Sequence, residues 1–120
     1  MENTIDCNKL ISMQKELDSK SIIIIKFTAD WCMPCKNIKE TCEFYTNNLP
    51  KNIIFYEIDI DESIELYMKL KSYKMVNGIP ALLAYYGGEK ENWYISDDSH
   101  LGGNIKGVKD FFERCLDYVK

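Results

Sequence analysis

Residues 21–36 constrain the fold of this chain more than any other segment. The run SIIIIKFT, residues 21–28, is mostly β-branched and apolar, which is typical of a central strand buried on both faces. Two cysteines, Cys32 and Cys35, follow after a short turn, and Pro34 between them suits the first turn of a helix. The segment therefore predicts a buried strand that leads into a helix, with a cysteine pair at the junction.

Helical spacing of apolar residues predicts three further helices. The last helix, capped by Asn104, has a nearly continuous apolar stripe, which is typical of a helix packed on a sheet. The helix after the cysteines is expected to run as far as Leu49, just before Pro50. The remaining two are expected at residues 6–19 and, with Asp61 or Ser63 as the capping residue, up to residue 73.

Apolar runs predict the other strands. A second buried strand is expected at residues 52–60, a hairpin of two strands at residues 81–96, and a short edge strand at residues 2–5. In the resulting order, β-α-β-α-β-α-β-β-α, strand–helix–strand units imply parallel pairing and the hairpin adds antiparallel strands. We expect an α/β fold: one domain of residues 1–120, with a mixed central sheet and helices on both faces.

The composition argues against several classes of partner. The net charge is −4 without a long block of like charge, so nothing favours nucleic acid or an anionic membrane surface. The first residues are polar and acidic, unlike a secretory signal, and the most apolar run is too short to span a bilayer. We therefore expect a cytoplasmic protein. In a reducing compartment its five cysteines are not expected to form a structural disulfide framework.

The surroundings of the cysteine pair favour thiol chemistry. A helix N-terminus and the neighbouring Lys36 both stabilise a thiolate, so Cys32 is expected to be the attacking thiol. Cys35, one turn into the helix, can then attack the Cys32 sulfur, which is thiol–disulfide exchange. A zinc site would need two further ligands, and no second close pair is present. A purely structural pair would not require Trp31, a flat apolar side chain that can shield the dithiol.

Two motifs connect the chain with a known family. FTADWCMPCK, residues 27–36, resembles the thioredoxin active-site segment F-x-A-x-W-C-G-P-C-K. NGIPALL, residues 77–83, resembles the loop that ends in a cis-proline before an inner strand, and Gly102 or Gly103 matches a glycine before the last helix. The resemblance implies the thioredoxin fold, with Cys32 as nucleophile and Cys35 as resolving thiol.

The resemblance also implies partners. Ile79 and Pro80 would dock a disulfide-bearing protein substrate beside the dithiol, and an external reductase would donate electrons. The sequence has no nucleotide or flavin motif, so no cofactor is expected. A monomer is expected. The rival interpretations are a protein that forms or isomerises disulfides, and a binding module that uses the fold only for docking.

The chain departs from the family pattern at the dithiol and behind it. Met33 replaces the usual glycine and places a flexible apolar side chain at the docking surface. Thioredoxins usually carry a buried Asp where this chain has Lys26, paired with a Lys where this chain has Glu57. We expect a reversed ion pair, because a buried unpaired charge is costly, and Glu57 could then take over proton transfer from Cys35. In the alternative, Lys26 reaches solvent and Glu57 is hydrated.

The link at residues 92–103 is bulkier than usual and carries Trp93 and His100. Two interpretations are a partner-contact loop and a solvated acidic turn with Trp93 packed on the sheet. Cys7, Cys42 and Cys115 fall on apolar helix stripes and are expected to be small core side chains.

Overall fold

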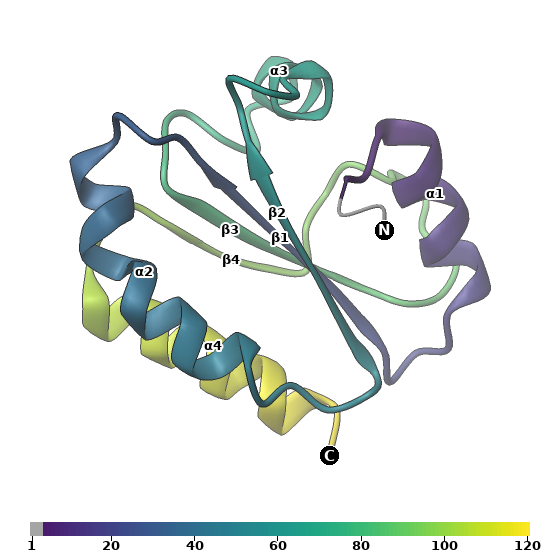
Figure 1. The fold of residues 1–120 in the computed structure, drawn as a ribbon. Helices are drawn as coiled ribbons and strands as arrows, with labels where there is room; N and C mark the ends of the chain where they lie inside the picture. The colour runs from purple at the N-terminus through teal and green to yellow at the C-terminus, as the bar shows by residue number, and fades with distance from the viewer. Residues whose placement is uncertain (1–3) are drawn as a thin grey trace.

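The structure, a computed structural model, describes residues 4–120 as a mixed sheet between two pairs of helices (Figure 1). In this part of the chain the sheet has four strands in the order β2-β1-β3-β4. Strands β1 and β2 are parallel, whereas β1–β3 and β3–β4 are antiparallel. The elements are α1 (Cys7–Glu16), β1 (Ile22–Thr28), α2 (Met33–Thr46), β2 (Ile53–Asp59), α3 (Glu65–Ser72), β3 (Ala81–Tyr86), β4 (Asp98–Leu101) and α4 (Ile105–Tyr118).

Strand β1 is the centre of the molecule, as its sequence predicts. Its side chains alternate between the two faces of the sheet. Ile23 and Ile25 join the core beneath α1 and α3, while Ile22 and Ile24 join the core beneath α2 and α4. All four are fully buried. Figure 1 shows these helix pairs on opposite sides of the sheet, so both faces of β1 are covered.

Helix α4 forms where the sequence predicts it. The Asn104 side chain caps its first turn by accepting a hydrogen bond from the Gly107 N–H at 2.7 Å. Phe111 and Phe112 are fully buried against the sheet. Phe112 also stacks on Tyr45 of α2, with ring centroids 4.9 Å apart. This contact ties α4 to the helix that begins at the cysteine pair.

The second strand of the hairpin was predicted in the wrong place. It is β4, which pairs with β3 in the register Ala81↔Leu101 to Ala84↔Asp98, so the 87–97 segment is a loop and not a strand. Helix α2 ends at Thr46, which leaves Leu49 beyond it. Of the edge strand predicted at residues 2–5, residues 2 and 3 lie outside the described residues, and residues 4 and 5 belong to no strand.

The predicted cap of α3 is also wrong. The helix begins after Ile64, whose side chain makes no capping hydrogen bond. The Asp61 carboxylate is engaged elsewhere, because it accepts a hydrogen bond from Trp31. No helix within residues 4–120 combines the length and apolar character needed to cross a membrane.

Candidate active site

The cysteine pair lies at the N-terminus of α2 and forms a disulfide between Cys32 and Cys35. Cys32 is the N-cap residue, and its sulfur accepts a hydrogen bond from the Cys35 N–H at 3.2 Å. Pro34 occupies the first turn, where its missing N–H costs no helical hydrogen bond. Because the amide donors and the dipole of α2 point toward the Cys32 sulfur, they stabilise a thiolate there once the disulfide is reduced.

The loop before β3 faces the dithiol. The Ile79–Pro80 bond is cis, and the Ile79 carbonyl oxygen lies 3.8 Å from the Cys32 sulfur. The Tyr67 hydroxyl accepts a hydrogen bond from the N–H of Gly78, and the Gly102 N–H donates to the Pro80 carbonyl. These bonds hold the loop beside a hollow of about 250 Å³ that Leu101 also lines.

Two apolar side chains next to Cys32 in the chain, and one that lines the hollow, are exposed to solvent. Trp31 and Met33 are 66 % and 62 % exposed, and Leu101 is 50 % exposed. The Trp31 ring is held in place because its Nε1 donates a hydrogen bond to Asp61 Oδ2 at 2.7 Å. Asp61 is a candidate helix cap by its sequence, and no local signal in the sequence points to its contact with Trp31.

Behind the dithiol, Lys26 and Glu57 form the ion pair expected from the sequence. They face one another across β1 and β2, and Lys26 Nζ lies 3.1 Å from Glu57 Oε1. The two ends differ in environment: the Lys26 side chain is 3 % exposed and the Glu57 side chain 53 %. Both line a cavity of about 140 Å³ together with Cys35, and the exposed Lys36 lines it from α2. The cavity thus joins the inner thiol to the ion pair.

The other three cysteines are free thiols that do not line this cavity. Burial raises the pKa of Cys42, and it raises that of Cys115 to about 12. The pKa of Cys7 is raised as well, mainly by burial and then by the neighbouring Glu65. Raised pKa values keep these thiols neutral and therefore poorly nucleophilic. Within residues 4–120 no cluster of three or more His, Cys, Asp or Glu side chains is suited to hold a metal ion.

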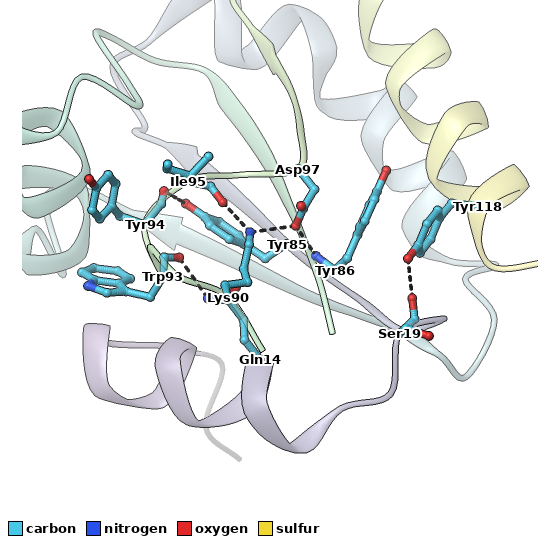
Figure 2. A network of polar contacts seen from close by, with 10 residues as sticks. All are labelled: Gln14, Ser19, Tyr85, Tyr86, Lys90, Trp93, Tyr94, Ile95, Asp97 and Tyr118. Carbon is cyan, nitrogen blue, oxygen red and sulfur yellow. Dashed lines mark hydrogen bonds and ion pairs between the residues drawn. The ribbon is translucent and has the colours of Figure 1, made fainter. Parts of the chain in front are cut away.

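The loop at 87–97 is tied to the body of the protein, as Figure 2 shows. The Trp93 carbonyl accepts a hydrogen bond from the buried Gln14 of α1, and the Tyr94 carbonyl accepts one from Tyr85. Lys90 pairs with Asp97 at 2.8 Å. Trp93 and Tyr94 also pack against the core beneath α1 and α3. The packing of Trp93 is as the second interpretation expects, but the acidic side chains are not simply solvated: Asp97 pairs with Lys90, and Asp98, the first residue of β4, pairs with Arg114.

The fold and the site define a redox protein with a Cys-x-x-Cys dithiol. The sequence model of the family described as Thioredoxin matches residues 8–105. Thioredoxin 1 of Plasmodium falciparum is 29 % identical over 110 residues, covering 88 % of this chain and 95 % of its own length. Putative thioredoxin-5 of Dictyostelium discoideum is 32 % identical over 107 residues, covering 86 % and 90 %. The crystal structure of Plasmodium falciparum thioredoxin superposes with a TM-score of 0.59 at 26 % identity, covering 89 % of this chain and 77 % of that one.

The chain belongs to the thioredoxin family. Its dithiol and the cis-proline loop meet at one end of the sheet.

Proposed function

We propose that this protein reduces disulfides in other proteins through Cys32 and Cys35. The observation that carries the proposal is the place of the Cys32 sulfur, which caps α2 and lies 3.8 Å from the Ile79 carbonyl of the cis-proline loop. A nucleophile in this position has its thiolate stabilised by the helix and has backbone groups beside it. Those backbone groups can pair with an extended substrate segment.

The reaction proceeds by two exchanges of sulfur–sulfur bonds. The Cys32 thiolate attacks one substrate sulfur, the substrate disulfide breaks, and the other substrate sulfur leaves as a thiolate that takes a proton from solvent. Cys35 then loses its proton and attacks the Cys32 sulfur, which releases the second substrate thiolate and forms the Cys32–Cys35 disulfide. The substrate gains two electrons and the dithiol loses two.

The exposed apolar surface fits a protein substrate. Trp31 and Met33 flank Cys32 in the chain and are exposed, and the exposed Leu101 lines the hollow beside the cis-proline loop. Exposed apolar side chains near one site are typical of contacts with protein partners. Met33, the departure from the usual glycine, adds an adaptable side chain that we propose influences the choice of substrate.

Glu57 is the proton acceptor in this proposal. It shares with Cys35 a cavity of about 140 Å³, which is large enough to hold water. Its half-exposed carboxylate can pass the Cys35 proton to solvent. In Glu57→Gln we expect a slower reduction of disulfides and an altered pH profile. An unchanged profile would remove Glu57 from the mechanism.

Regeneration of the dithiol needs an external reductase, and we place the protein in the cytoplasm. Three of its five cysteines are free thiols, which suits a reducing compartment. The protein is expected to act as a monomer.

Reduction of insulin by dithiothreitol tests the proposal. We expect wild type to accelerate the reaction and Cys32→Ser to lose the acceleration, with Cys7→Ser as a control that keeps it. Equal activity of wild type and Cys32→Ser would favour a binding module instead of an enzyme. The alternative of disulfide formation or isomerisation predicts a more oxidising dithiol.

A further inference from the structure

We propose that Lys26 is a positioning residue whose buried ammonium stabilises the thiolate of Cys35 when the mixed disulfide is resolved. The inference rests on the proposed function, because only an exchange reaction requires Cys35 to lose its proton. It assigns a role to the charge of Lys26 in the central strand, because the exchange between the two cysteines does not by itself require that charge.

The position of Lys26 places it on the same cavity as the inner thiol. It follows Ile22 and Ile24 on the face of β1 that α2 and α4 cover, and it lines the same cavity as Cys35. Its side chain is 3 % exposed, so bulk solvent screens its ammonium only weakly. A weakly screened cation near a thiol favours the thiolate form.

Glu57 does not cancel this effect. Its carboxylate would raise the pKa of a nearby thiol, but its side chain is 53 % exposed and is therefore screened by water. Cys42, further along α2, shows the balance of the two charges. After the dominant effect of burial, which raises its pKa, Lys26 lowers the pKa of Cys42 by more than Glu57 raises it. At Cys42 the cation is therefore the stronger of the two influences.

The other charged groups around the cavity lie at its exposed rim. These are Asp30, in the turn before Trp31, together with Lys36 and Lys39 on α2. Solvent screens these charges, and the two lysines act in the same direction as Lys26. Lys39 therefore offers a matched control, since it lines the same cavity with the same charge but is exposed.

The bonds and protons exchanged in the resolving step show where Lys26 acts. Cys35 passes its proton through the cavity to Glu57 or to solvent, and its thiolate then attacks the Cys32 sulfur. The bond between Cys32 and the substrate breaks, the substrate leaves as a thiolate, and the Cys32–Cys35 disulfide forms. Lys26 takes no part in bond exchange; it lowers the free energy of the Cys35 thiolate that attacks.

The test is a titration of Cys35 in a Cys32→Ser background, followed by the ¹³C chemical shift of the Cys35 Cβ in labelled protein. Removing Cys32 leaves a single thiol in the pair, so the midpoint of the pH titration is that of Cys35. We expect Lys26→Met to raise this midpoint by about one pH unit. Lys39→Met is expected to raise it by less than half as much. Lys26→Gln, which keeps a hydrogen-bonding group toward Glu57, is expected to behave like Lys26→Met and serves in its place if that variant does not fold.

An unchanged midpoint in the Lys26 variants, or an equal shift in Lys39→Met, would overturn the inference. The titration does not depend on any substrate, so its outcome is separate from the insulin assay. If wild type fails to reduce insulin, the proposed function fails even though the Lys26 shift is observed. If wild type is active and the Lys26 variants show no shift, only the role of Lys26 fails.

Discussion

Removing Lys26 and removing Glu57 from their ion pair should change the free energy of unfolding by very different amounts. Glu57→Gln leaves an ammonium that is 3 % exposed without its countercharge, whereas Lys26→Met leaves a carboxylate that is 53 % exposed and can be hydrated. A buried charge that loses its partner is strongly destabilising. Replacement of the buried member by an apolar side chain of similar length leaves no unpaired charge in the interior, so its cost should be small.

The geometry sets the size of the difference. At the observed separation of 3.1 Å and an effective dielectric constant of about 20, the Coulomb energy of the pair is about 5 kcal/mol. Water around the half-exposed Glu57 screens part of this energy, and the Gln side chain still accepts a hydrogen bond from Lys26. We therefore expect Glu57→Gln to lower the free energy of unfolding by about 2 kcal/mol. We expect Lys26→Met to change it by less than about 1 kcal/mol.

Urea unfolding of the oxidised protein at pH 7, followed by tryptophan fluorescence, measures both values by linear extrapolation. The double variant Lys26→Met/Glu57→Gln is the control, and it should recover most of the stability that Glu57→Gln loses. Equal losses in the two single variants, or a larger loss in Lys26→Met, would refute the reasoning.

Three further predictions concern α4. Asn104→Ala removes the cap of the helix and should lower the free energy of unfolding by about 1 kcal/mol in urea, with Asn104→Asp, which retains a capping oxygen, as the control. Burial raises the pKa of Cys115 from 9.0 to about 12, so its contribution to stability is complete below pH 9 and declines as the pH rises toward 12. Cys115→Ala should therefore show a shallower loss of stability above pH 9 than wild type, and an equally steep loss would contradict the assignment. In Gly107→Ala the added Cβ would lie 2.1 Å from the His100 ring, so we expect a loss of about 1–3 kcal/mol; a more stable variant in the same urea assay would show that the ring moves aside freely.

Local patterns were sufficient for the parts of the fold that bury one continuous apolar surface. The continuous apolar run at 22–25 and the helical spacing of apolar residues in α4 were enough to place these side chains in the core. Asn104 marks where α4 begins. The position of the cysteine pair followed as well, since Pro34 and the end of β1 fix the start of α2.

Contacts between distant segments decided the features that the sequence did not show. Trp93 and Tyr94 have aromatic side chains typical of strands, yet they lie in a loop and pack against the core beneath α1 and α3. The strand that pairs with β3 begins later, at Asp98. The Asp61 carboxylate could have capped α3, but it binds Trp31 instead. In both cases the local preference was overridden by a partner far away in the sequence.

The pairing of Lys26 with Glu57 was predicted from the family resemblance, but its asymmetry was not. The sequence shows two opposite charges on neighbouring strands. Only the structure shows that one is buried and the other half exposed, and that a cavity joins both to Cys35.

The reduction potential of the Cys32–Cys35 couple tests the proposed function most directly. It can be measured by equilibrating the protein with redox buffers, trapping the free thiols by alkylation, and quantifying the oxidised fraction. If the protein is a protein-disulfide reductase, we expect a value of about −270 mV, which is typical of thioredoxins. A value between about −120 and −180 mV would contradict this account and identify the dithiol as an oxidant or isomerase.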